Sequence, residues 1–286
     1  MPLIPAILKD EALISQVEEF AHDSRNFHLW WLGQSGYLVQ WKGSILLIDP
    51  YLSDSLTRKY AASDKPHIRM SERVIDPRLL KNIRVASSSH NHTDHLDGDT
   101  LIPIIHNNPG MRFIIPEANR KFVAERIQMP LEYPTGINDG QSAAIDEFIF
   151  HGVPAAHNEL ERDEKNLCRY MGYVLEVGKW KIYHSGDTLW YDGMEEILQQ
   201  FQVHLALLPI TGNDPARGVA GNLNAREAVQ LAKAIGAKMV IPCHYNMFSF
   251  NTADPNEFAH FAGKAQQPFT ILEPGAHWSS EKLEAY

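Results

Sequence analysis

The sequence of 286 residues has few cysteines, no long apolar run and no excess of positive charge. Its two cysteines, Cys168 and Cys243, lie far apart, which gives no disulfide framework and indicates a reducing compartment. No stretch is long and apolar enough to span a bilayer, and the first ten residues lack the basic leader of a signal peptide. We therefore expect a cytoplasmic protein without a membrane partner.

The charge balance argues against a nucleic-acid partner. The chain has 26 Lys and Arg residues against 35 Asp and Glu residues, and its formal net charge is −9 at pH 7. Binding to nucleic acid depends instead on a basic face that neutralises phosphates. With 44% hydrophobic and 21% charged residues, the composition is that of an ordinary globular protein with a sizeable core.

The most informative stretch holds three histidines and a carboxylate within six positions, directly after the apolar residues 83–86. Residues two apart at the end of a strand point to the same side, so His90 and His92 can hold one metal ion. If the chain then turns, Asp94 and His95 come round beside them and can hold a second ion. The alternative interpretation is a solvated, histidine-rich loop.

Further candidates follow or end predicted strands. His157 comes after an apolar strand and opens a polar loop, and His244 ends the predicted strand 238–243. Asp49 ends another strand, either as a turn residue or as a partner that orients a ligand histidine. Asp187 is either the N-cap of a helix at 195–201 or a ligand, and His184 lies buried in its strand or beside the ligands.

Hydrophobic periodicity predicts strands that alternate with helices, which indicates an α/β fold. The expected helices are 11–22, 101–106, 117–127, 195–201, 224–234 and 255–262. The expected strands are 29–32, 37–39, 45–48, 112–116, 148–153, 170–177, 179–184, 203–210, 238–243 and 269–272.

Two loops are candidates for substrate contact. Residues 53–76 have no clear periodicity, and long loops of this kind are commonly lids or binding loops. In an acidic chain this loop carries a run of basic side chains, namely Arg58, Lys59, Lys65, His67, Arg69 and Arg73. It is either solvated or a basic wall that faces an anionic substrate. We expect substrate contacts from Arg69, from Arg217 in the second loop, 211–222, and from His277.

The pattern His-x-His-x-Asp-His resembles the signature of the metallo-β-lactamase superfamily. Four further segments resemble its L-ascorbate-6-phosphate lactonase-like branch, namely residues 31–36, 48–54, 185–188 and 241–245. The similarity runs from about Phe27 to about Pro274. It implies a four-layer αββα sandwich with mixed sheets. The expected organisation is a single domain over residues 1–286, with the helix at about 11–22 as an appendage.

The resemblance also implies roles for the candidates. His90, His92 and His157 form one metal site, and Asp94, His95 and His244 form a second. Asp187 bridges the two, while Asp49 and His184 support the ligands. Gln34 stands where many superfamily members carry histidine, either as a hydrogen-bonding residue near the site or as a turn residue. The implied cofactors are two divalent cations, zinc or manganese with iron as a further alternative, because histidine and carboxylate suit all three.

These residues predict a metal-dependent hydrolase. In the expected reaction a metal-bridging hydroxide attacks a small anionic ester, with Asp94 and Asp187 as the catalytic residues. By resemblance the substrate is a lactone of a sugar phosphate. A phosphodiesterase or nuclease with the same two-metal site is one alternative, and a non-catalytic metal-binding sensor or scaffold is another. The sequence leaves open the substrate, the metal and whether the chain forms a homo-oligomer.

Overall fold

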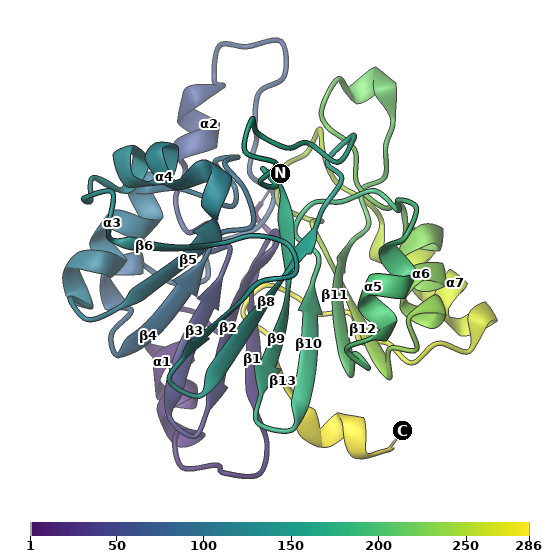
Figure 1. The fold of residues 1–286 in the computed structure, drawn as a ribbon, viewed down its shortest axis with the longest axis horizontal. Helices are drawn as coiled ribbons and strands as arrows, with labels where there is room; N and C mark the ends of the chain where they lie inside the picture. Colours follow the sequence, from purple (N-terminus) through teal and green to yellow (C-terminus); the bar gives the residue numbers. More distant parts are fainter. Residues whose placement is uncertain (1, 286) are drawn as a thin grey trace.

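The computed structural model of the chain describes residues 2–285. Two mixed β-sheets face each other across a buried core, and helices cover their outer faces (Figure 1). Helices α3 (Gly98–Asn107) and α4 (Arg120–Ile127) lie on the side of the first sheet. Helices α5 (Met194–Gln199), α6 (Ala225–Ala234) and α7 (Pro255–Ala265) lie on the side of the second. The expected αββα sandwich is therefore the observed fold.

The first sheet has the strand order β13-β1-β2-β3-β4-β5-β6. Strands β1, β2 and β3 form an antiparallel meander, and β3 to β6 run parallel. Its strands are β1 His28–Gly33, β2 Gly36–Trp41, β3 Ser44–Ile48, β4 Ile83–Ser87, β5 Arg112–Pro116, β6 Pro134–Ile137 and β13 His277–Ser279.

The second sheet has the order β12-β11-β10-β9-β8-β7. Strands β7 to β10 are antiparallel, whereas β10, β11 and β12 run parallel. Its strands are β7 Ser142–Ile145, β8 Phe148–Pro154, β9 Met171–Val177, β10 Trp180–His184, β11 Leu205–Pro209 and β12 Met239–Cys243.

The remaining helices are short or lie at the edge of the sandwich. They are α1 Glu11–Glu19 and α2 Ser55–Lys59, with 3-10 turns at Pro77–Leu79, Glu117–Asn119, Pro215–Arg217 and Ser280–Ala285. Helix α1 buries Leu13 and Val17 in the core beneath the first sheet, together with side chains of α3 and α4. Among the helices of residues 2–285, none has the length and apolar character needed to cross a membrane. The single-domain organisation stays a prediction.

Local sequence signals explain where several helices begin. The Asp97 side chain accepts a hydrogen bond from the Thr100 backbone N–H and caps α3. A capping box starts α6, because Asn224 and Glu227 each accept from the backbone N–H of the other. These caps end the preceding loops at defined residues, and those loops carry the site.

Most predicted elements are confirmed, but the last strand is wrong. Phe269 makes only an isolated bridge to Val240, and the final strand is β13, which pairs with β1. Strands β6 and β7 were not predicted from the sequence, since each is short, lacks a strong apolar alternation and lies at a sheet edge. The loop at 53–76 contains the short helix α2, and α1 ends at Glu19 rather than at residue 22.

Two histidines pair beneath the first sheet, on β1 and β13. His28 Nδ1 lies 2.9 Å from His277 Nε2, and His28 Nε2 lies 3.1 Å from Asp23. Both rings stack with Phe20. Burial lowers the pKa of His277 from 6.5 to about 4, helped by the nearby His28. The neutral form of His277 is therefore the one that the folded protein holds.

This pair predicts a loss of stability in acid. Because the folded pKa of His277 lies below 6.5, its contribution is complete above about pH 6.5 and is lost as the pH falls toward 4. His277→Gln keeps a hydrogen-bonding group but does not titrate. Between pH 7 and pH 4.5 we expect the melting temperature of the wild type to fall by about 2 °C more than that of H277Q. Calorimetry measures this difference, with the exposed His106→Gln as control. Equal pH slopes in wild type and H277Q would contradict the expectation.

Candidate metal centre

The histidine-rich segment turns sharply after β4. The backbone N–H groups of His95 and Leu96 both donate to the carbonyl oxygen of His92, at 3.0 and 2.8 Å. This turn brings the rings of His90 and His95 to a centroid distance of 4.1 Å. His90 and His95, five positions apart, therefore face one space, as the spacing predicts.

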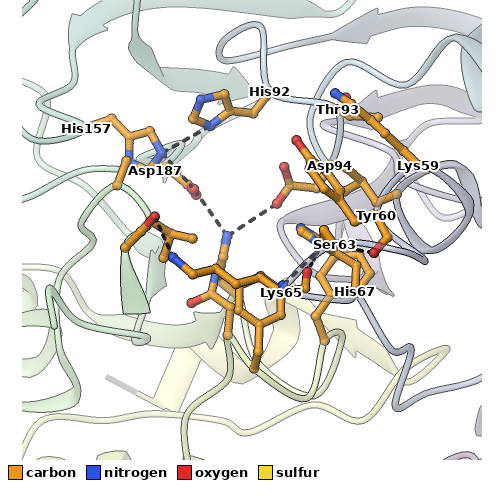
Figure 2. Close-up of a pocket in the computed structure, with 18 of the residues that line it drawn as sticks. Lys59, Tyr60, Ser63, Lys65, His67, His92, Thr93, Asp94, His157 and Asp187 are labelled. Atoms are coloured by element: carbon orange, nitrogen blue, oxygen red, sulfur yellow. Dashed lines mark hydrogen bonds and ion pairs between the residues drawn. The ribbon is translucent and has the colours of Figure 1, made fainter. Parts of the chain in front are cut away.

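Side chains from other strand ends converge on the same space. The potential metal-binding atoms form three groups, within each of which they lie within 4.8 Å of one another, namely His90–His92–His157, His90–His95–Asp187 and Asp94–His95–His244. These are the seven residues that the sequence predicts as ligands. Figure 2 shows His92, His157, Asp94 and Asp187 around a common space, carried by different segments of the chain.

Asp187 lies between the two predicted sites. Its Oδ1 is 3.3 Å from His95 Nε2, and its Oδ2 is 3.2 Å from His244 Nε2 and 3.7 Å from His157 Nε2. Helix α5 has Gly193 as its N-cap, so Asp187 does not cap it. This excludes the N-cap alternative that the sequence left open. A bridging role for Asp187 stays a prediction.

Hydrogen bonds behind the site fix which ring atoms face it. The His95 Nδ1–H donates to Asp49 Oδ2 at 2.7 Å, and the His157 Nδ1–H donates to the Gly221 carbonyl oxygen at 2.9 Å. The Nε2 atoms of both rings therefore point toward the common space. His184 donates to the Ser35 carbonyl oxygen and accepts from the Gly186 N–H, and so holds the turn before Asp187.

The backbone is strained around this centre. Gln34, Asp49 and His244 have φ angles of 51°, 42° and 62°, in the left-handed region that favours glycine. Gly186, with φ 60°, has no room for a side chain, since a Cβ there would lie 2.8 Å from the Ser89 Cβ. Such conformations persist only where the surrounding structure enforces them, and they cluster at functional sites.

Burial and carboxylates act on the histidines in opposite directions. Burial lowers the pKa of His157 to about 4 and that of His90 well below its usual range. Burial is also the largest single effect on the pKa of His95 and His244, but the carboxylates of Asp187 and Asp94 together outweigh it, and the pKa of His244 rises to about 9. The centre thus concentrates negative potential, which stabilises a positive charge there.

Divalent cations fit this donor set. Three buried atoms that face the space, His90 Nε2, His95 Nε2 and Asp187 Oδ1, make no hydrogen bond among residues 2–285, although the last two lie at ion-pair distance, 3.3 Å apart. His157 Nε2 and His92 Nδ1, two potential acceptors, lie 3.2 Å apart. Imidazole and carboxylate are the ligands that zinc, manganese and iron accept. The unsatisfied atoms are therefore those that a cation would use.

A cavity of about 470 Å³ opens onto the donor atoms. Its volume is in the range of small-molecule sites. The loop at 53–76 forms one side with Lys59, Tyr60, Lys65 and His67, which surround the same space as Asp94 in Figure 2. The loop at 211–222 and the segment after β12 close the other sides. Both loops that the sequence marks as substrate loops thus line the cavity.

A family model described as the beta-lactamase superfamily domain matches residues 45–245, more than half of the chain. The chain belongs to the β-lactamase superfamily. The matched span starts in β3 and ends directly after His244, so it contains all three groups of donor atoms.

Relatives within the superfamily cover most of the chain. A UPF0173 metal-dependent hydrolase of Methanosarcina mazei is 28% identical over 250 residues, 86% of this chain and 95% of the relative. Another, from Alkaliphilus metalliredigens, is 30% identical over 238 residues, 80% of this chain and 89% of the relative. The solved structure of a metallo hydrolase from Ignicoccus hospitalis aligns with a TM-score of 0.64 at 23% identity, covers 89% of this chain and 98% of its own, and shows the shared fold.

Three predicted substrate contacts are not placed at the cavity of this superfamily member. The Arg69 guanidinium is held by Asp54 and the Ser53 carbonyl oxygen. Arg217 donates to the carbonyl oxygens of Thr211 and Gly212 and to the Asn251 side chain, which ties the loop at 211–222 together. His277 lies in the pair with His28 on β13. Each side chain has local partners and none of the three lines the cavity, so their contact with substrate stays a prediction.

Other cavity residues were not predicted from the sequence. Phe248 and Phe250 follow β12 closely, and their rings lie 5.0 and 4.6 Å from that of His67. Asn222 is buried beside the donor atoms, with its Oδ1 unpaired among the described residues. The signal that could have found them is their position within a few residues of a ligand or in the loop at 211–222.

The hydrogen bond from His95 to Asp49 predicts a loss of metal affinity on mutation. Asp49→Asn leaves one acceptor oxygen where the carboxylate offers two, one to the Ser89 N–H and one to His95, and partners of this kind are worth about 10- to 100-fold in affinity. We expect a decrease of that size for zinc or manganese, measured by isothermal titration of metal-free protein. Asp146→Asn, which breaks only an exposed contact with Arg84, is the control. Wild-type affinity in D49N would show that Asp49 does not orient His95.

Proposed function

We propose that this metal-dependent hydrolase of the superfamily cleaves a small anionic ester, a lactone by preference, with two divalent cations. One observation carries the proposal, namely a small cavity with a His and Asp donor set at its base and free lysines at its wall. The lactone preference follows from the resemblance of four sequence segments to the ascorbate-6-phosphate lactonase-like branch.

Support for two cations comes from the arrangement of the donor atoms. His90, His92 and His157 form one group, and Asp94, His95 and His244 form another, with Asp187 within 3.7 Å of members of both. In this arrangement the chain would hold each ion by imidazole and carboxylate groups. Bound divalent cations supply Lewis acidity and lower the pKa of water to about 7.

Asp94 is the carboxylate that can move a proton. It lines the cavity with its side chain 17% exposed, whereas Asp187 lies deeper at 4%. The neighbouring His95 and His244 hold the pKa of Asp94 well below its usual range despite burial, so its carboxylate is ionised at neutral pH. Asp94 is therefore placed to take a proton and return it to the leaving group, while Asp187 holds the donor groups together.

The expected preference for an anionic substrate follows from which basic side chains of the loop at 53–76 are paired with carboxylates. Arg58, Arg69 and Arg73 each pair with an aspartate. Lys59 and Lys65 line the cavity, and among the described residues neither has a carboxylate within ion-pair distance. The arginines are thus neutralised by the protein, and the two lysines remain available to an anionic group of the substrate.

The cavity also has an apolar, aromatic wall. The rings of Tyr60 and His67 stack at a centroid distance of 4.3 Å, and Phe248 and Phe250 pack edge-on against His67. Such a wall suits the carbon skeleton of an organic ester. A cavity of about 470 Å³ and a net charge of −9 favour a small substrate over a polynucleotide.

The shared position of Asp187 predicts that both metal binding and turnover depend on it. Asp187→Ala should abolish metal-dependent hydrolysis across a panel of lactones, aryl esters and bis-p-nitrophenyl phosphate. Elemental analysis should show less bound metal per chain. The matched control is Asp192→Ala, an exposed carboxylate five positions further on. Full turnover in D187A with wild-type metal content would overturn the two-cation proposal, and strong phosphodiester cleavage by the wild type would replace the lactone preference.

The free lysines predict selectivity for charge. An ion pair of this exposure is worth about 1 kcal/mol, so Lys65→Gln should raise KM for an anionic ester about 5-fold. KM for a neutral ester of the same shape should stay unchanged, and kcat should change little for both. Lys238→Gln, an exposed lysine distant in sequence from the loop, serves as the control. Equal effects of K65Q on the charged and neutral esters would rule out Lys65 as an anion contact.

A further inference from the structure

A glutamine amide lies inside the second donor group. Gln34 stands between β1 and β2 and is fully buried. Its Nε2 lies 2.8 Å from Asp94 Oδ2 and 2.9 Å from His244 Nε2. These are two of the three residues that form the Asp94–His95–His244 group. The amide thus contacts the atoms that a cation in this group would use.

The backbone holds Gln34 in this place. Its φ angle of 51° lies in the left-handed region, which is costly for a residue with a side chain. Its carbonyl oxygen accepts from the Trp31 indole N–H at 3.0 Å and from the His244 backbone N–H at 2.9 Å. Gln34 and His244 are therefore joined twice, through the backbone and through the side chains. The fold enforces this contact at the cost of backbone strain.

The nitrogen and the oxygen of the Gln34 amide differ in their hydrogen bonding. Its nitrogen faces Asp94 and His244, whereas its oxygen, Oε1, is buried without a hydrogen-bond partner among residues 2–285. A buried carbonyl oxygen without a partner is unfavourable. In this orientation the amide nitrogen stands 2.9 Å from His244 Nε2, an atom that a cation in this group needs.

A half-turn of the amide exchanges its oxygen and nitrogen without moving the chain. The oxygen then stands beside Asp94 Oδ2 and the lone pair of His244 Nε2. Three electron-pair donors at one point repel one another unless a cation lies between them. The side chain of Gln34 can therefore either occupy these two groups or join them around an ion.

We propose that Gln34 is a metal ligand, whose amide oxygen completes the group of Asp94, His95 and His244. Together with the Asp94 carboxylate it makes this group richer in oxygen than His90, His92 and His157, which offer imidazole only. Oxygen donors favour harder ions such as Mn²⁺, whereas imidazoles suit Zn²⁺. The two groups thus differ in their preferred metal. This inference rests on the two-cation proposal and adds a ligand to it.

The test is a metal titration that does not depend on turnover. Metal-free protein is titrated with Mn²⁺ or Zn²⁺ by calorimetry, and bound ions are counted by elemental analysis. Gln34→Met keeps the length of the side chain and removes the amide. We expect it to weaken the tighter of the two Mn²⁺ sites, the oxygen-richer one, at least about 10-fold and to leave the other site unchanged. Gln34→His should shift the preference of the same site from Mn²⁺ toward Zn²⁺.

The matched control is Gln40→Met, which replaces a buried glutamine on β2 that lies outside the donor groups. Melting temperatures check that the variants fold. If Gln34→Met does not fold, Gln34→Glu decides, because a carboxylate keeps the oxygen and should tighten Mn²⁺ binding. Unchanged or tighter Mn²⁺ binding in Q34M, or no tightening in Q34E, overturns the inference alone. A wild-type protein that binds only one ion overturns the two-cation proposal as well.

Discussion

The placement of two carboxylates, Asp94 and Asp187, among histidines is the constraint on which the rest of the site depends. A carboxylate loses its hydration on burial, and this is costly unless opposite charge and hydrogen bonds compensate it. Asp187 is compensated by His95 and His244, at 3.3 and 3.2 Å. These residues come from the turn after β4, the end of β10 and the end of β12, which belong to different sheets. The sandwich is therefore what allows this charge cluster to exist away from water.

The same constraint explains where the strained backbone lies. Gln34, Asp49 and His244 adopt left-handed conformations directly beside the donor atoms. Each is also held by a buried hydrogen bond, from the His244 N–H to the Gln34 carbonyl oxygen and from the Ser89 N–H to Asp49. Rigid strands on both sides transmit this restraint, because β1, β3 and β12 are fully or almost fully buried. Local strain is thus balanced by packing of the whole core.

The cavity has two kinds of surface, which offer different chemical groups. Its base is polar and belongs to the strand ends, whereas its sides are loops with lysines and aromatic rings. Loops tolerate change more readily than strand ends do, so substrate preference can vary while the donor set stays. Ion pairs with aspartates neutralise the arginines of the loop at 53–76 and leave Lys59 and Lys65 available to an anionic group in the cavity.

The sequence by itself indicated the fold class and the seven candidate donor residues, through the resemblance of its His-x-His-x-Asp-His pattern and because each candidate follows or ends an apolar strand. It could not place Arg69, Arg217 or His277, since their partners Asp54, Asn251 and His28 are chosen by how loops and edge strands pack. The edge strands β6 and β7 have too little apolar pattern to be recognised locally. Only the tertiary structure decided that the Gln34 amide meets Asp94 and His244, because that contact joins residues 60 and 210 positions apart.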